Sequence, residues 1–183
     1  FDNGKFYMAY TADENIAIAV SDSPMGPFRQ AVKAPIAVGQ KQIDPFVFRD
    51  KDGKKYLFHV RLKDGNRIFV AELKSDYSGI KEETLKECLH AELPWENTAN
   101  ADWTVSEGPT VIREGKYYYM FYSANDFRNK DYAVGVAIAE NIYGPWKKLE
   151  DQPALSQKNS GFAGTGHGDI FKKGKQWYYV CHT

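Results

Sequence analysis

The chain has 183 residues, enough for one ordinary hydrophobic core, and its 24 Lys and Arg balance 24 Asp and Glu. A net charge of zero argues against a nucleic-acid partner, which favours a basic surface. No run approaches the roughly 18 apolar residues of a membrane span, so we expect none. Aromatic residues make up 15% of the chain, and such rings both pack β cores and line sugar sites.

Short segments rich in aromatic and β-branched residues recur along the whole chain, with turn signals between them. Residues 82–89 are the one plausible helical turn, which we place in a loop insertion. Long helices are absent from the pattern, which argues against an α/β barrel. The predicted strands span residues 6–11, 16–21, 43–48, 55–60, 67–73, 106–112, 117–123, 132–139, 166–171 and 176–182.

A cassette of polar group, apolar strand, turn and aromatic strand occurs three times, each time with a different polar head. The heads are Asp44 in Ile-Asp-Pro, Glu107 in Glu-Gly-Pro and His167 in Gly-His-Gly. The spacing between turns is near the roughly 40 to 50 residues of a propeller blade, with insertions. It is measured between the turn glycines Gly4, Gly53, Gly115 and Gly174, which are 49, 62 and 59 residues apart.

This anatomy predicts an all-β fold, a β-propeller whose blades each hold about four short strands. Two matched corners, Met-Gly-Pro-Phe at 25–28 and Tyr-Gly-Pro-Trp at 143–146, strengthen the repeat. Because a propeller has to close its ring, we interpret the chain as a piece of a larger propeller. Its predicted segments are the end of one blade at 1–42, two nearly whole blades at 43–100 and 101–155, and the start of another at 156–183.

Asp44 and Glu107 begin corresponding predicted strands, 9 and 8 residues before the turn glycines Gly53 and Gly115. Either residue alone is more often a turn residue that caps a loop. Their equivalence in register favours a second interpretation, in which adjacent blades aim both carboxylates at one central funnel. Two carboxylates in one desolvated pocket raise the pKa of one of them towards the range of a general acid, which is what glycoside hydrolysis requires.

The three cassette motifs occur in the order found in glycoside hydrolase family 43, which the chain resembles over essentially its whole length. The resemblance implies a five-bladed β-propeller that hydrolyses xylose- and arabinose-containing plant polysaccharides with inversion, as a β-xylosidase or an α-L-arabinofuranosidase. By this resemblance, residues 1–42 are the end of the second blade and residues 43–100 the third blade. Residues 101–155 are then the fourth blade, and residues 156–183 the start of the fifth. The first blade would then lie outside this chain.

The resemblance also implies roles for the three cassette heads. Glu107 is the expected general acid, and Asp44 is the carboxylate that modulates its pKa and orients it. The family's general base is an Asp on the first blade, so we expect the base outside this chain and the chain alone to be inactive. His167 lies near the axis, where many members bind a calcium or sodium ion through it and waters. The alternative role for His167 is that of a structural histidine that bonds the strand backbone. We do not expect the protein to require a cofactor.

Four aromatic or basic residues are candidates for the sugar-binding subsites. Trp103 lies just before the expected acid and either lines the sugar pocket or packs in the core. Phe127 and Arg128 follow a predicted strand and could reach the rim from a loop. Phe46 could face the funnel, although packing in the core is the more frequent outcome for such a residue.

The two cysteines and the family resemblance bear on the compartment and the partners of the protein. Cys88 and Cys181 more often remain buried thiols than form a single bridge, and they leave the compartment open. The resemblance implies a bacterial periplasmic or extracellular enzyme with an oligosaccharide or polysaccharide substrate; the oligomeric state stays open.

The alternatives are an exo-β-galactanase of the same family and a non-catalytic carbohydrate-binding propeller, which would keep the aromatics and lose the acid or the base. A protein-interaction propeller is disfavoured because the Gly-His and Trp-Asp signatures do not recur from blade to blade.

Overall fold

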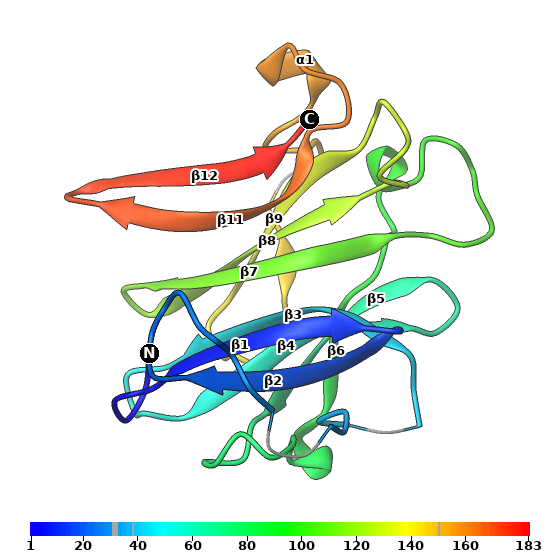
Figure 1. Cartoon of the computed structure of the whole chain (residues 1–183). Coiled ribbons are helices and arrows are strands. Elements are labelled where there is room, and N and C mark those ends of the chain that lie inside the picture. Colours follow the sequence, from blue (N-terminus) through cyan, green and yellow to red (C-terminus); the bar gives the residue numbers. More distant parts are fainter. Residues whose placement is uncertain (31–32, 38, 150) are drawn as a thin grey trace.

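The computed structural model describes residues 1–30, 33–37, 39–149 and 151–183, and its strands form four antiparallel sheets (Figure 1). The first sheet pairs β1 (Phe6–Ala12) with β2 (Asn15–Ser21), and the last pairs β11 (Gly166–Lys173) with β12 (Gln176–His182). The second sheet has the order β3 (Gln42–Arg49), β4 (Lys55–Leu62), β5 (Asn66–Glu72), β6 (Lys86–Leu89). The third has the order β7 (Ser106–Glu114), β8 (Tyr117–Ala124), β9 (Ala133–Ala139), β10 (Lys147–Lys148).

The sheets are arranged side by side through their first strands. β1 contacts β3, β3 contacts β7 and β7 contacts β11, so the four first strands follow one another in chain order. Figure 1 shows β11 and β12 on one side of β7, and β3 on its other side. This succession of antiparallel sheets around their first strands confirms the predicted all-β propeller. The numbering of the blades within a complete ring stays a prediction.

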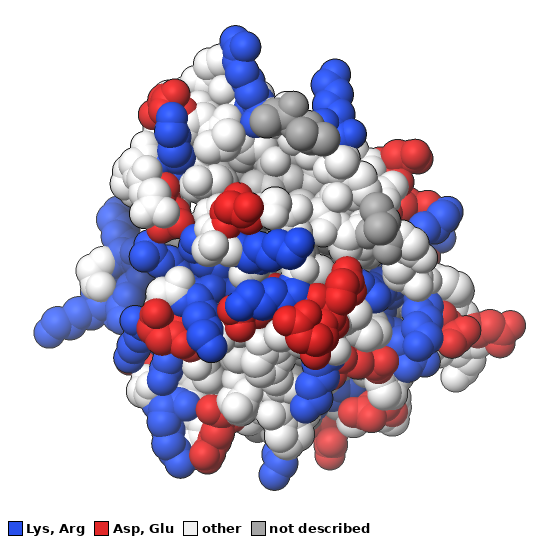
Figure 2. All heavy atoms as spheres, turned by 90° about the horizontal axis from the view of Figure 1, so that it is seen from below, with Lys and Arg blue, Asp and Glu red and all other residues white. Residues whose placement is uncertain are grey.

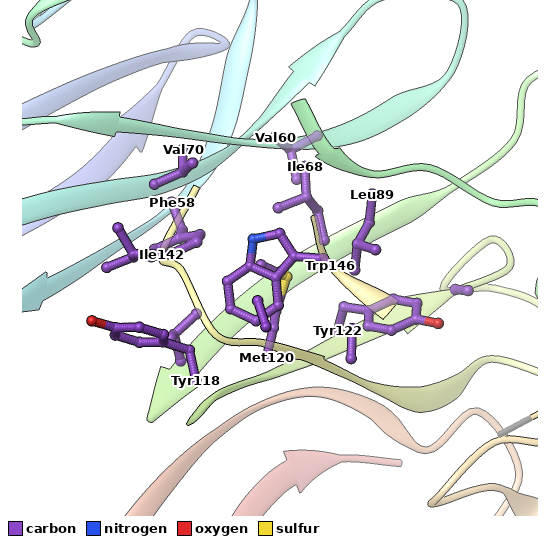
Figure 3. Close-up of a cluster of buried hydrophobic side chains, with 14 of the residues drawn as sticks. Phe58, Val60, Ile68, Val70, Leu89, Tyr118, Met120, Tyr122, Ile142 and Trp146 are labelled. Atoms are coloured by element: carbon purple, nitrogen blue, oxygen red, sulfur yellow. The ribbon is translucent and has the colours of Figure 1, made fainter. Parts of the chain in front are cut away.

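The apolar residues of β4 are shared between two core clusters. Phe58 faces the larger cluster, where it meets Met120 of β8 and Trp146 in the space between the second and third sheets (Figure 3). Leu57, one residue earlier, faces a second cluster with Ile16 of β2. Successive side chains of a strand point to opposite faces, so a strand between two neighbouring sheets is apolar on both. Burying one such side chain contributes about 1.5 to 3 kcal/mol.

The segment 82–89, predicted as a helical turn in a loop insertion, is a short 3-10 turn followed by a strand. Only Glu82–Thr84 forms a short 3-10 turn, η1, and β6 then pairs antiparallel with β5. Leu89 lies opposite Ile68 and is buried in the larger cluster. The prediction holds for the 3-10 turn but missed the strand, because β6 is only four residues long and carries Lys86 and Glu87, which hide its β pattern.

The two Gly-Pro-aromatic corners have the same backbone geometry. Gly26 and Gly144 have φ values of +80° and +82°. A Cβ at Gly26 would lie 3.0 Å from the amide nitrogen of Phe28, and one at Gly144 would lie 2.7 Å from that of Trp146. Only glycine fits such a left-handed position that is also this close to the following backbone. The correspondence of the two corners is therefore confirmed.

The short helices and the surface add little to the placement of the site. Besides η1, the described residues form η2 (Pro94–Glu96) and α1 (Gln157–Ser160), and none of these helices is long and apolar enough to cross a membrane. Cys88 and Cys181 are free and partly buried, in agreement with thiols rather than a bridge. Figure 2 shows Lys and Arg interspersed with Asp and Glu on the face in view, as expected for a chain with zero net charge.

Candidate active site

The first strands of the last three sheets share an irregularity. In each of them the pairing register with the next strand shifts between two ladder positions, so that a β-bulge interrupts the ladder. Bulges redirect side chains and are frequent next to active sites. The pairs that flank the three shifts are Ile43↔Val60 and Phe46↔Phe58, Glu107↔Ser123 and Thr110↔Phe121, and Gly166↔His182 and Asp169↔Val180.

The bulges show which residues of the three cassettes are equivalent. Asp44 corresponds to Gly108 and His167, and all three have left-handed φ values of 54°, 56° and 46°. Glu107 corresponds instead to Ile43, so the predicted equivalence of Asp44 and Glu107 is wrong by one residue. The reason is the length of the turn, because residues 50–54 connect β3 to β4 whereas only 115–116 connect β7 to β8. Counting back from the turn glycines therefore misaligned the two strands.

Both carboxylates nevertheless face one cavity of about 520 Å3. A larger depression of about 800 Å3 lies along β1 and β2, but no Asp, Glu or His is among the described residues that line it. The smaller cavity brings together titratable and aromatic groups from the second, third and fourth sheets, and we take it as the candidate active site. It is lined by Ile43, Asp44, Asn66, Trp103, Val105, Glu107, Asp126, Phe127, His167 and His182.

Glu107 lies at the start of β7 and its carboxyl group is held at both oxygens. The residue is only 8% exposed. The side-chain amide of Asn66 donates a hydrogen bond to Oε2 at 2.9 Å, and the hydroxyl of Tyr132 donates one to Oε1 at 2.8 Å. Tyr132 is completely buried, and burial followed by the nearby Glu107 charge raises the pKa of its hydroxyl. The tyrosine therefore remains a neutral hydrogen-bonding group beside the carboxyl.

Asp44 occupies the bulge of β3 beside Glu107. Its Oδ2 accepts a hydrogen bond from the backbone N–H of Gly108 at 3.0 Å, and its own N–H donates to the hydroxyl of Thr11 at 3.2 Å. Burial is the main reason why the pKa of Asp44 is raised, and the charge of Glu107 raises it further. His167 and the Gly108 N–H act in the opposite direction. The charge of Glu107 thus disfavours the charge of Asp44.

His167 lies between the two carboxylates. Its Nε2 is 3.9 Å from Asp44 Oδ1, and its Nδ1 is 3.9 Å from Glu107 Oε1. These separations exceed a hydrogen bond but bring opposite charges close. The proximity of Glu107, and then of Asp44, raises the pKa of His167, against the effect of burial. Its backbone N–H donates to the Ser123 hydroxyl at 2.8 Å, so the residue bonds the strand framework while its ring faces the cavity.

The surroundings of His167 do not form a cation cage made of protein ligands. No group of three or more His, Cys, Asp or Glu side chains among the described residues is arranged to hold a metal ion. Calcium prefers six to eight oxygen ligands. A calcium or sodium ion at His167 would therefore have to take most of its ligands from water, and its presence stays a prediction.

The four candidate subsite residues are divided by the structure. Trp103 and Phe127 line the cavity and are 50% and 62% exposed. Phe46 is partly buried and packs against the larger core cluster instead. Arg128 is absent from the described lining of the cavity, because its guanidinium pairs with Asp126, whose pKa it holds at about 2, and lies over the ring of Phe127.

Four polar residues of the site were missed by sequence reasoning, one of which is Asp126 in the cavity lining. Asn66 and Tyr132 bond Glu107 from 41 and 25 residues away in the sequence, and His182 closes the cavity from the end of β12. The one local signal was the Asp-Gly turn before Asn66, which indicates a hairpin but not a contact with a neighbouring sheet. Tyr132 was recognised only as the start of a strand.

Comparison with known proteins identifies relatives over the whole chain. Residues 1–183 match the family described as glycosyl hydrolases family 43. A xylan 1,3-beta-xylosidase of Vibrio sp is 25% identical over 90% of this chain and 30% of its own length, and a beta-xylosidase of Xylanibacter ruminicola is 28% identical over 98% and 62%. The chain thus spans between about a third and two thirds of these relatives.

Solved structures give the same result. The crystal structure of an endo-1,4-beta-xylanase from Bacteroides thetaiotaomicron VPI-5482 is 44% identical, with a TM-score of 0.90 over 97% of this chain and 60% of that one. A thermostable family-43 glycoside hydrolase is 36% identical, with a TM-score of 0.88 over 99% and 63%. The fold of this chain is therefore that of a substantial part of these proteins.

Proposed function

Because the chain belongs to glycosyl hydrolases family 43, we propose that the protein is a glycosidase that hydrolyses xylose- or arabinose-containing plant cell-wall polysaccharides or oligosaccharides. The observation that carries the proposal is the meeting of the buried Glu107 and the partly buried Asp44 at one cavity whose wall includes exposed aromatic rings. A general acid has to face the substrate while being shielded from bulk water, and Glu107 meets both conditions. The aromatic rings provide flat apolar surfaces for a sugar.

In the proposed reaction, Glu107 is the general acid. Its carboxyl proton passes to the glycosidic oxygen while the bond from that oxygen to the anomeric carbon breaks. A water molecule attacks the anomeric carbon from the opposite face and gives its proton to a general base, which inverts the configuration. The base has to lie roughly 6.5 to 9.5 Å from the acid to leave room for this water, and we place it outside the present chain.

Asp44 has a supporting part in this reaction. Its carboxyl group faces the same cavity as Glu107, and we propose for it the part that the family resemblance implies, a carboxylate that modulates and orients the acid. The bond from the Gly108 N–H fixes the Asp44 carboxylate to the backbone that directly follows the acid. Asp44 is therefore tied to the position of Glu107 as well as to its charge.

The family supports a proposal for the substrate class and for the compartment. Curated and structural relatives are named for activity on xylan, xylosides and arabinosides, and we propose the same class here, as a β-xylosidase or α-L-arabinofuranosidase. A bacterial periplasmic or extracellular location would bring the enzyme to such polymers.

A hydrolysis screen tests the proposal. Full-length protein, with the segment that precedes this chain, is incubated with aryl β-xyloside, aryl α-arabinofuranoside and aryl β-galactoside beside its Glu107→Gln variant. We expect turnover of a xyloside or an arabinofuranoside that the variant loses, and release of the inverted anomer by NMR. Turnover of the galactoside alone would favour an exo-β-galactanase. Sugar binding without turnover of any substrate would refute a glycosidase and favour a carbohydrate-binding propeller.

A further inference from the structure

A buried asparagine bridges an aromatic wall of the cavity and the acid. Asn66 is the first residue of β5 and only 8% exposed. Its amide Nδ2 donates to Glu107 Oε2 at 2.9 Å, and its Oδ1 accepts a hydrogen bond from the indole Nε1 of Trp103, also at 2.9 Å. Both ends of one amide are thus occupied, one by the proposed acid and the other by a ring that is half exposed to the cavity.

The orientation of this amide follows from the chemistry of its partners. An indole N–H can only donate a hydrogen bond, so the amide oxygen of Asn66 has to face Trp103. The amide N–H groups therefore face Glu107, where they can only donate. The hydroxyl of Tyr132 at the other carboxyl oxygen can turn and accept instead. Asn66 thus keeps Oε2 as the accepting oxygen and leaves Oε1 as the oxygen that carries the proton.

The backbone holds the three residues together independently of these side-chain bonds. The N–H of Asn66 donates to the carbonyl of Thr104 at 2.8 Å, and Asn66 forms a parallel bridge with Val105. Gly65 has a φ of +116°, and a Cβ there would lie 2.8 Å from the Thr104 carbonyl oxygen. The end of the β4–β5 hairpin is therefore pressed against the segment that carries Trp103 and leads into Glu107.

From this geometry we propose that Asn66 is a positioning residue that couples Trp103 to Glu107; the inference rests on the proposed glycosidase function. A sugar ring packed on Trp103 fixes the indole, the indole N–H fixes the amide, and the amide fixes the plane of the acid's carboxyl group. Trp103 then has two separable effects. Its ring face contributes to substrate binding, and its N–H contributes to proton donation through Asn66.

The test removes the indole N–H and keeps an aromatic face. Full-length wild type and the Trp103→Phe and Asn66→Ala variants are assayed on the hydrolysed sugar with a phenyl leaving group, which needs protonation, and with a dinitrophenyl leaving group, which does not. Loss of one hydrogen bond is expected to lower kcat on the phenyl glycoside about fivefold for Trp103→Phe and to change kcat on the dinitrophenyl glycoside less than about twofold. The double variant is expected to lose no more than Asn66→Ala alone, because both changes break one bridge.

A matched control is Trp177→Phe, which makes the same substitution at an exposed tryptophan of β12 outside the cavity lining. Thermal unfolding of each variant shows that it folds, and Trp103→Phe, on a half-exposed side chain, keeps the test valid if Asn66→Ala does not fold. Equal losses on both leaving groups, a change in KM alone, or multiplicative losses in the double variant would each overturn the coupling. Failure of the wild type to hydrolyse any glycoside would refute the proposed function and this inference with it.

Discussion

A buried ion pair between Glu96 and Lys148 leads to a stability prediction that can be tested without a substrate. Glu96, in η2, is completely buried, and its Oε2 lies 2.6 Å from the Nζ of Lys148 in β10. The same oxygen accepts the backbone N–H groups of Glu92 and Leu93, and Oε1 accepts the hydroxyl of Tyr122 at 2.6 Å. The pair therefore joins the segment before β7 to the third sheet.

The perturbation is Lys148→Met, which keeps the length of the side chain and removes its charge. Breaking a buried pair typically costs about 3 to 5 kcal/mol, because one charge stays buried without a partner. Three hydrogen bonds to Glu96 remain, so we expect a loss near the lower end, about 3 kcal/mol of unfolding free energy. In a domain of this size that loss lowers Tm by roughly 6 to 12 °C.

The assay is denaturant and thermal unfolding of Lys148→Met beside Lys116→Met. Lys116 pairs with Glu140 at 3.0 Å, but both side chains are about two thirds exposed, and such pairs contribute about 0 to 1 kcal/mol. The same chemical change is thus made at a buried and at an exposed pair. If Lys148→Met costs no more than Lys116→Met, the idea that burial makes Lys148 indispensable to Glu96 is refuted.

Three further predictions concern protons. Glu107→Gln should abolish turnover of glycosides with poor leaving groups and spare activated aryl glycosides better; equal loss on both in steady-state kinetics would count against Glu107 as the acid. Asp44→Asn should lower kcat or move the acidic limb of the pH–rate profile, because burial raises the pKa of Asp44 and the variant lacks this titration; an unchanged profile would contradict its modulating part. His59 is completely buried, and burial lowers its pKa to about 3, whereas the pKa of a histidine in the unfolded chain is about 6.5. The contribution of His59 to the free energy of unfolding should therefore be fully present above pH 6.5. It should fall by about 1.4 kcal/mol per pH unit as the pH drops from 6.5 towards 3. His59→Gln should flatten this decline in unfolding experiments between pH 6.5 and 4, and an equally steep decline would assign it to other groups.

The strands were predictable because their sequence pattern is local. β4 and β8 are long aromatic segments bounded by turns, and no tertiary information is needed to recognise them. β6 was not predictable in the same way, because what makes it a strand is its pairing with β5 and the burial of Leu89. A segment whose conformation depends on pairing with another strand is difficult to recognise from its own residues.

The site was predictable in its residue types but not in its alignment. The three polar heads are visible as repeated motifs, yet the turn between β3 and β4 is longer than that between β7 and β8, which conceals the true register. The neighbours of Glu107 were not predictable, because Asn66 reaches it from another sheet and Tyr132 from the residue before β9, two strands away in the same sheet. Their contacts exist only once the propeller has formed.

The bulge explains why three copies of one cassette have to differ. Each bulge places two adjacent residues at the centre. In β7 the first of them is Glu107 and the second is Gly108. In β11 the glycine comes first, as Gly166, and the large residue second, as His167. A Cβ at Gly108 would lie 3.2 Å from the His167 ring, and one at Gly166 would lie 2.3 Å from the ring of Tyr132.

Two of the rings at the centre therefore lie against a glycine of a neighbouring copy. The His167 ring occupies the space beside Gly108, and Tyr132, which bonds Glu107, occupies the space beside Gly166. A side chain in place of either glycine would crowd the ring beside it. Unequal heads on one repeated bulge allow a carboxyl group, a second carboxylate and an imidazole to converge. This asymmetry brings together at one end of the repeat the groups on which the proposed acid catalysis depends.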